Sequence, residues 1–396
     1  MFEYEKKIIK YLEKHYIELM FIFITLISVL IRLLMRNFES KDFRIFLSPW
    51  FDYLKMNGGL KALANYPGDY NAPYVTIMAL LTYIPVNKLY LIKAVSIVFD
   101  YGLAISCAEL VKFLVPKSKK KILYLLTYSV IILLPEVMLN SALWAQCDSG
   151  YTMFVVLALL FLLKKDYTKS FIFLGLSFSL KLQFIFILPL FVILYVCEKK
   201  FSILHFFIIP AVDIITCIPA IIFGTPIKKI LTVYFSQTGT YSNYLSLNIP
   251  NIYNIIPGNT SMFYKIGVLI TLVALASMLV YVIYKKIKWN NEKILLLGLW
   301  SIIITTFLLP GMHERYLYMG EILAVIYYIL YKKNLPMTIF LITSAVMTYS
   351  VYLFKAPDYL NILSVIFLLL IIYFTKNTLK ELSQRWLNEK SIKIYQ

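Results

Sequence analysis

Long apolar runs constrain the fold of this chain more than any other feature. They recur along most of its 396 residues and are often 17 to 25 residues long, which is about the length that crosses a bilayer as a helix. Hydrophobic residues make up 60% of the chain and charged residues only 15%, far from the balance of a soluble domain. The sequence therefore predicts an all-α polytopic membrane protein.

The distribution of Lys and Arg predicts how the chain threads the membrane. The net charge of +18 would favour nucleic acid in a soluble protein, but basic residues mark the cytoplasmic loops of membrane proteins. We therefore expect no nucleic-acid partner. If the segment 72–86 does not cross the membrane, 25 of the 39 Lys and Arg residues fall inside. This choice predicts about twelve spans with both chain ends in the cytoplasm, at about 17–35, 89–115, 122–140, 150–163, 170–182, 183–197, 203–223, 263–284, 294–309, 316–331, 335–353 and 359–375.

This threading collects polar motifs on the extracytoplasmic side. The first outer loop, 36–88, is aromatic and broken by Pro and Gly, which is typical of short helices lying in the membrane interface. A second long outer loop is predicted at 224–262. We treat residues 1–396 as one transmembrane domain whose site faces outward, in a bacterial plasma membrane.

Two motifs of the first loop carry carboxylates. Asp42 lies in "SKDFR", where it could act as a general base toward a hydroxyl group, and Arg44 beside it could bind a phosphate. A solvated loop charge is the other interpretation of Asp42. Asp69 and Tyr70 lie in "YPGDYNAPY", where an acid among aromatic rings suits a sugar, although an interfacial aromatic belt has the same composition.

Two further motifs lie at the outer ends of predicted spans. "WAQCDSGY" contains Trp144, Gln146 and Asp148, and polar groups at that depth need a partner or a ligand. "SLKLQ" places Lys181 and Gln183 in an otherwise apolar stretch. A tight turn between two helices explains this motif, but a lone cation there is also well placed to meet a lipid phosphate.

The motif "LLPGMHERYLYMG" puts three ionisable residues in succession after a helix-breaking Pro-Gly pair. We expect His313, Glu314 and Arg315 to begin the next helix, where free backbone N–H groups attract phosphate. Arg315 could grip a phosphate with two parallel hydrogen bonds, and His313 could donate or carry a proton. A structural pair of Glu314 with Arg315 is the alternative. Deeper in the membrane, we expect Lys93 and Asp100 to form a packing pair.

Taken together, the motifs "LWAQCDS", "SLKLQ", "SLNIPNIYN" and "MHERY", with Asp42 and "YPGDYNAPY" before them, resemble the GT-C superfamily of membrane glycosyltransferases. The resemblance is closest to bacterial relatives of GPI mannosyltransferase II, the PIG-V-like family, and covers about residues 30–320. It implies an inverting, metal-independent transfer of a sugar from a polyprenyl-phosphate donor. The sequence departs from the family pattern at Gly68-Asp69.

The resemblance also implies a role for each candidate residue. Asp42 would be the catalytic base, with no metal and no cofactor. The donor phosphate would be bound by Arg44, Lys181, His313 and Arg315. The sugar or the acceptor would be bound by Asp69, Tyr70, Trp144, Gln146, Asp148, Gln183, Asn248, Asn251 and Glu314.

We expect a glycosyltransferase that moves a hexose, with mannose as a candidate, onto a hydroxyl of an extracytoplasmic glycan or glycolipid. Its partners would be the polyprenyl-phosphate sugar, the acceptor and membrane lipids. A lipid-linked oligosaccharide polymerase or ligase is a second candidate, although the loop 224–262 contains no arginine to hold a diphosphate. A lipid-linked sugar transporter is a third, and would need ionisable residues between both faces.

Overall fold

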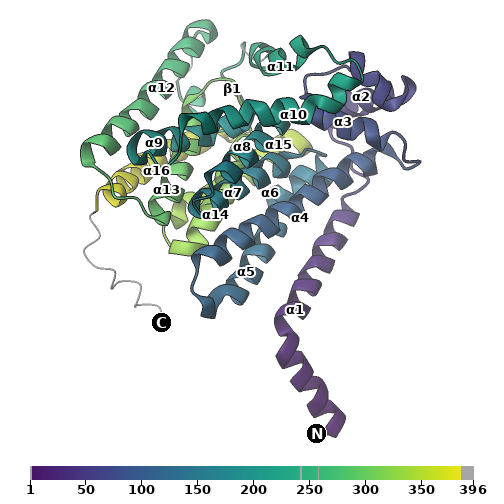
Figure 1. Cartoon of the computed structure of the whole chain (residues 1–396), viewed down its shortest axis with the longest axis vertical. Helices are drawn as coiled ribbons and strands as arrows, with labels where there is room; N and C mark the ends of the chain where they lie inside the picture. Colours follow the sequence, from purple (N-terminus) through teal and green to yellow (C-terminus); the bar gives the residue numbers. More distant parts are fainter. Residues whose placement is uncertain (1, 241–242, 257, 385–396) are drawn as a thin grey trace.

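The fold is a bundle of helices, described by a computed structural model over residues 2–240, 243–256 and 258–384. The C-terminal basic residues from Arg385 onward, and parts of the loop 224–262, lie outside the described residues. Within these ranges, seven helices are long and apolar enough to cross a membrane, and a bent pair could form an eighth span. The chain is thus an all-α, multi-pass integral membrane protein (Figure 1).

The long helices share uninterrupted apolar sequence. They are α1 (Glu3–Leu34), α4 (Lys88–Leu114), α10 (Ile208–Ile222, preceded by the turn η6, Ile203–Phe207), α12 (Thr260–Lys285), α13 (Asn291–Leu308), α15 (Leu335–Phe354) and α16 (Leu360–Ser383). The bent pair joins η3 and α5 (Lys117–Lys119, Lys120–Ile132) to α6 and η4 (Pro135–Met138, Leu139–Leu143) at 53°.

Shorter helices fill the bundle between the long ones. They are α7 (Asp148–Leu163), α8 (Tyr167–Leu180), the turn η5 (Leu182–Ile187) with α9 (Leu188–Glu198), and α14 (Tyr318–Tyr331). Every segment predicted as a span therefore contains a helix. Several are shorter than a bilayer requires, so the number of crossings stays a prediction.

The helix α1 differs from the others because little of it is buried. It extends away from the bundle, with the N-terminus at its far end (Figure 1), and only Ser28 and Arg32 of its residues are buried. An apolar helix that leaves most of its surface uncovered is suited to lipid rather than to a protein core. Its C-terminal end is fixed by Lys93, whose Nζ donates to the carbonyls of Met35 and Phe38 at 3.0 and 2.7 Å.

Asp100 pairs with Arg32 rather than with Lys93. The Arg32 Nη2 lies 2.9 Å from the Asp100 carboxylate, and both side chains are almost fully buried. The expected Lys93–Asp100 pair is therefore wrong. The reason is that α1, which packs mainly against α5, reaches α4 through side chains: its arginine neutralises Asp100, and the carbonyls at its C-terminal end satisfy Lys93.

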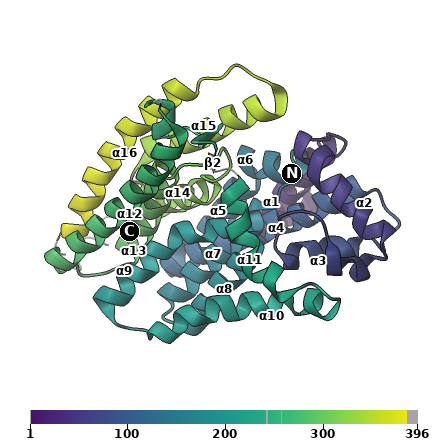
Figure 2. The ribbon, with the colours of Figure 1, turned by 90° about the horizontal axis from the view of Figure 1, so that it is seen from above.

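The segment 36–88, which we predicted as the first outer loop and call the first loop below, is a folded unit. It contains the turn η1 (Phe43–Leu47), α2 (Ser48–Met56), the turn η2 (Gly59–Asn65) and α3 (Ala72–Leu81), which lie together at one edge of the bundle (Figure 2). Its apolar residues form a second hydrophobic core with parts of α4 and α10. The ten residues of α3 extend about 15 Å, about half of what a span needs, and whether this segment crosses stays a prediction.

The second long loop is tied to the bundle by a short parallel pairing. It contains α11 (Ile227–Thr240), β1 (Ser246–Leu247) and the turn η7 (Ile252–Asn254). β1 pairs with β2 (Met312–His313). The prediction that His313 begins a helix is therefore wrong, because its backbone pairs with Leu247 and the helix α14 begins only at Tyr318.

Candidate functional site

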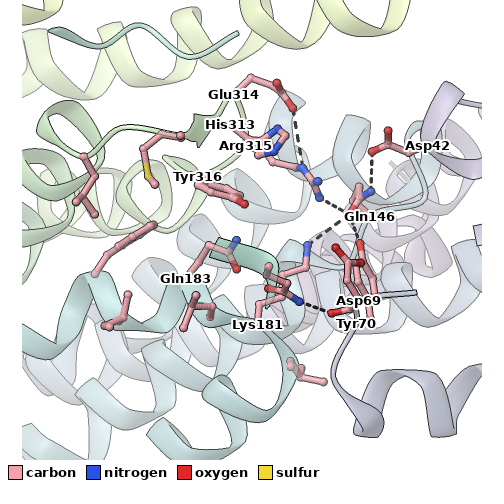
Figure 3. A pocket seen from close by; sticks show the side chains of 18 of the residues that line it. Asp42, Asp69, Tyr70, Gln146, Lys181, Gln183, His313, Glu314, Arg315 and Tyr316 are labelled. Atoms are coloured by element: carbon pink, nitrogen blue, oxygen red, sulfur yellow. Dashed lines mark hydrogen bonds and ion pairs between the residues drawn. The ribbon is translucent and has the colours of Figure 1, made fainter. Parts of the chain in front are cut away.

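The predicted site residues converge on one cavity of about 690 Å³, a size typical of small-molecule sites. Its walls come from the first loop, from η5, from the segment after η4, from α11, α12 and α15, and from the loop before α14 (Figure 3). The predicted residues that line it are Asp42, Asp69, Tyr70, Gln146, Lys181, Gln183, His313, Glu314 and Arg315. Sequence positions more than 270 residues apart thus meet at one place.

Asp42 is held in a fixed orientation by neutral groups. Its Oδ2 accepts hydrogen bonds from Trp144 Nε1 at 2.9 Å and Gln146 Nε2 at 3.0 Å. Its Oδ1 accepts one from the hydroxyl of Tyr352 on α15. Among the described residues no Lys or Arg nitrogen forms an ion pair with this carboxylate, so its charge is oriented without being neutralised by a direct partner.

The backbone around Asp42 explains this placement. The hydroxyl of Ser40 donates to the carbonyl of Trp144 at 2.8 Å and accepts from the N–H of Phe43 at 3.1 Å. One serine therefore joins the start of the first loop to the segment that carries Trp144 and Gln146. Ala145 between them adopts a φ of 67°, a left-handed conformation that is uncommon for residues other than glycine.

Gln146 connects Asp42 to the cations of the site. Its Oε1 accepts hydrogen bonds from Tyr70 at 3.0 Å, from Lys181 Nζ at 3.4 Å and from Arg315 Nη1, while its Nε2 faces Asp42 (Figure 3). The side chain is 3% exposed. Its oxygen thus faces positive charge and its nitrogen faces negative charge.

Lys181 and Arg315 share a buried carboxylate behind the cavity wall. Asp148 lies 2.6 Å from Lys181 Nζ and 4.0 Å from Arg315 Nη1, and it also accepts a hydrogen bond from Asn140 at 2.7 Å. The description of Lys181 as a lone cation is therefore wrong. It ends α8 in an extended conformation, and this brings its side chain to the first residue of α7.

His313 ends β2, and Glu314 and Arg315 begin the turn that follows it along the cavity. Burial and the nearby Arg315 lower the pKa of His313 to about 3. This burial favours a neutral imidazole in the empty site, which can donate one hydrogen bond. Its role in proton transfer stays a prediction. The side chain of Glu314 is buried, and burial raises its pKa to about 7 against the opposing effect of Arg315.

Asp69 lies at the first-loop end of the cavity. Its backbone carbonyl accepts a hydrogen bond from Gln237 on α11, and burial raises the pKa of its carboxyl group, while Arg315 and Lys181 act in the opposite direction. Gly68 before it has a φ of +94°, and a Cβ there would lie 2.5 Å from the ring of Trp50. Gly68, at which the sequence departs from the pattern of the resembling family, therefore packs against Trp50, an aromatic side chain that lines the cavity.

One part of the wall is apolar and reaches the surface. Ile185 and Phe235 line the cavity and are 44% and 79% exposed. The other aliphatic and phenylalanine side chains of the lining, with its proline and methionine, are Phe46, Leu47, Leu180, Leu182, Phe186, Val268, Leu309, Pro310 and Met312. The cavity therefore joins a charged wall to an apolar one that continues to the outside of the protein.

Five predicted residues do not line the cavity. Trp144 and Asp148 contact the site from behind, through Asp42 and Lys181. Arg44 is exposed and pairs with Glu39 at 3.3 Å. Asn251 caps the turn η7 through Tyr253, and Asn248 lies beside β1.

Some lining residues were not predicted. Tyr352, Gln237, Tyr264 and Trp50 contribute polar or aromatic groups. Tyr352 stacks on Trp144 with ring centroids 4.6 Å apart. Within the described ranges, the structure has no group of three or more His, Cys, Asp or Glu side chains that could hold a metal ion.

Comparison with protein-family models finds no match for this sequence, and comparison with curated proteins finds none that is significantly similar.

Proposed function

We propose that this protein is a glycosyltransferase that moves a hexose from a polyprenyl-phosphate donor to a hydroxyl group of a glycan or glycolipid, with mannose as the first candidate. One observation carries the proposal. An oriented carboxylate, Asp42, lines the same cavity as the cations of Lys181 and Arg315, and much of the remaining lining is apolar, with Ile185 and Phe235 exposed at the surface. A base, a phosphate site and a lipid path are what such a reaction requires.

Each group has a role in the proposed displacement. The oxygen of the acceptor hydroxyl attacks C1 of the sugar, and Asp42 accepts the proton of that hydroxyl. The bond between C1 and the phosphate oxygen breaks, and the electron pair leaves with the lipid phosphate. Arg315 and Lys181 stabilise the charge of the departing phosphate, and attack opposite the leaving group inverts the configuration at C1.

The apolar wall fits the lipid part of the donor. Covering an isoprenoid chain with apolar protein surface stabilises the bound state by about 25 cal/mol per Å² of apolar area removed from water. Ile185 and Phe235 are exposed at the end of this wall, so a chain lying there could continue into the bilayer. The charged wall would then face the phosphate at the head of the same molecule.

The proposal includes the finer topology. About twelve crossings with both ends in the cytoplasm put the cavity at the extracytoplasmic face of a bacterial plasma membrane. The support is the distribution of Lys and Arg. Cysteine labelling from either side of the membrane, at exposed positions such as Lys355 and Lys332, tests the assignment.

Product analysis tests the reaction. The purified protein is incubated with polyprenyl-phosphate hexoses and extracted lipid or glycan acceptors, and the products are identified by mass spectrometry. We expect one added hexose and free polyprenyl phosphate. Asp42→Asn should reduce transfer by at least about 100-fold, the usual contribution of a general base.

The matched control is Asp358→Asn, because Asp358 is an exposed carboxylate outside the cavity. It should transfer at the wild-type rate. Transfer by Asp42→Asn near the wild-type rate would remove the base assignment. Transfer of whole oligosaccharides from a lipid diphosphate would favour the polymerase or ligase, and lipid movement without a covalent product would favour the transporter.

A further inference from the structure

The carboxyl groups at the cavity outnumber the cations. Asp42, Asp69 and Glu314 line it and Asp148 lies directly behind, whereas Lys181 and Arg315 are the Lys and Arg residues among the described lining. A polyprenyl-phosphate hexose, which we take as the donor on the basis of the proposed function, is a phosphodiester with one permanent negative charge. Its arrival would add a fifth anion to a site where charges are poorly screened by water.

Glu314 is the carboxyl group placed to respond to that charge. Its side chain is 2% exposed, and Oε1 lies 3.9 Å from Nε of Arg315 (Figure 3). Within the described part of the chain, Nε of Arg315 is buried and makes no hydrogen bond. The guanidinium group therefore has a donor available on the side that faces Glu314, where a phosphate oxygen would compete with the carboxylate.

Charged groups from other elements influence the pKa of Glu314. Asp42 from the first loop and Asp148 from α7 both favour its protonated form, and Arg315 beside it favours the ionised form. Tyr352 from α15 is also close enough for its charge state to depend on Glu314. A backbone hydrogen bond also favours the ionised form. A phosphate that takes over part of the Arg315 interaction therefore weakens the larger of the two influences that keep Glu314 ionised.

We propose that Glu314 takes up a proton when the phosphate of the donor binds at Arg315. The neutral acid no longer competes for the guanidinium group, and its O–H can donate a hydrogen bond to a phosphate oxygen. Binding of the donor phosphate and loss of the negative charge of Glu314 then occur together. The net charge of the cavity stays the same when the donor enters.

The coupling sets the pH dependence of donor affinity. Burial places the pKa of Glu314 at about 7 in the empty site, and the bound phosphate raises that pKa further. Below about pH 7 the group already carries its proton, so the affinity is at its highest. As the pH rises above 7, binding must include the uptake of a proton, and the affinity falls.

Calorimetry can count this proton without any transfer reaction. The probe is farnesyl methyl phosphate, a phosphodiester whose charge stays constant over the pH range used. Binding to the full-length protein in detergent is measured at pH 7.5 in two buffers of different ionisation enthalpy. The difference between the two observed binding enthalpies, divided by the difference between the two buffer ionisation enthalpies, gives the number of protons taken up on binding.

For the wild type we expect an uptake of more than half a proton, and a roughly fivefold loss of affinity between about pH 6 and pH 8. Glu314→Gln should take up almost no proton and bind with an affinity that does not change over this range. Asp69→Asn is the matched control, because the pKa of Asp69 is also raised by burial. It should retain the wild-type uptake.

Equal proton uptake by Glu314→Gln and the wild type would overturn the proposal, and so would loss of the uptake in Asp69→Asn. A wild type that binds the probe without proton uptake, or does not bind it, also overturns it. None of these results bears on whether a hexose is transferred, because mass spectrometry of the products answers that question separately.

Discussion

Two buried ion pairs in this molecule have the same chemistry and different surroundings. Arg32 and Asp100 form a clamp between α1 and α4, with side chains 2% and 1% exposed. Lys181 and Asp148 form the second pair, with Arg315 beside them, at the wall of the cavity. The comparison separates an arrangement that holds helices together from one that can receive a ligand.

The difference lies in the remaining hydrogen-bond donors. Arg32 directs Nε and Nη2 to Asp100 and uses its other contacts for the carbonyls of Ser28 and Ile132. Arg315 leaves its buried Nε without a hydrogen bond among the described residues, and its side chain is 14% exposed. Asp100 Oδ1 also accepts no hydrogen bond among the described residues, so the two regions differ in their donors. The donors of Arg32 are directed to the fold, whereas Arg315 keeps an unbonded donor at a cavity, where it can bind an anion.

Removing one partner of the clamp should have the largest effect on stability. Arg32→Met leaves the carboxylate of Asp100 buried without its cation, which typically costs about 3–5 kcal/mol. We expect a clear fall in the thermal unfolding temperature in detergent, measured by tryptophan fluorescence. Hexose transfer per folded molecule should change little.

The double variant Arg32→Met with Asp100→Leu is the control for this prediction. It removes both charges, and apolar replacements of buried pairs are often neutral or stabilising. Most of the lost stability should therefore return. A double variant as unstable as Arg32→Met would mean that helix packing, and not the ion pair, sets the stability of this region.

The second prediction concerns Arg315, at the wall of the cavity. Arg315→Lys keeps the charge but loses the planar group that can hold a phosphate with two hydrogen bonds. We expect the KM for the donor to rise about tenfold, since one charge-assisted hydrogen bond contributes about 1.5 kcal/mol. The KM for the acceptor and the unfolding temperature should stay near wild-type values.

Arg44→Lys is the matched control, because Arg44 is close in sequence to Asp42 but its side chain is 68% exposed. It should leave both KM values unchanged. A rise in the acceptor KM alone for Arg315→Lys would place the acceptor, not the donor, at this guanidinium group.

The smallest expected effect comes from Tyr352. Tyr352→Phe removes one of the three donors that orient Asp42, a loss of about 1 kcal/mol, or roughly fivefold in kcat. Tyr359→Phe, at an exposed tyrosine nearby in sequence, should have no effect. A loss of more than about 100-fold for Tyr352→Phe would give its hydroxyl a direct role in the reaction.

The positions of the helices can be predicted from the sequence more readily than which of them cross the membrane. Apolar runs locate each helix because continuous burial in protein or lipid needs continuous apolar sequence. They do not distinguish a helix that crosses the membrane from one that ends inside the bundle. The segment of α7 is as apolar as a span and packs against α4 and α8, but its 16 residues are fewer than the roughly 20 of a typical span, so its crossing stays a prediction.

The candidate site was partly predictable because its polar residues stand out in apolar surroundings. Asp42, Gln146, Lys181 and Arg315 were singled out in this way, and they share one cavity. Tyr352 could not be found, since tyrosine at the end of a span is also typical of an interfacial anchor.

The errors in the predicted site have local causes. Arg44 follows Asp42 by two residues, but the π-helical turn η1 directs it to the surface, where it meets Glu39. Asn251 is used for capping the turn η7. The helix start expected at His313 was lost to a strand pairing between residues 66 positions apart, which no local pattern indicates.

The amide of Gln146 has a consequence for how substitutions will combine. It keeps its oxygen toward Lys181 and Arg315 and its nitrogen toward Asp42, and a half-turn of the amide would reverse both matches. Loss of the cations therefore removes the preference that orients Asp42, and loss of Asp42 weakens the preference that orients the cations. In a double-mutant cycle, Asp42 and Arg315 should behave as neighbours, with energies that do not add, although a whole side chain separates them.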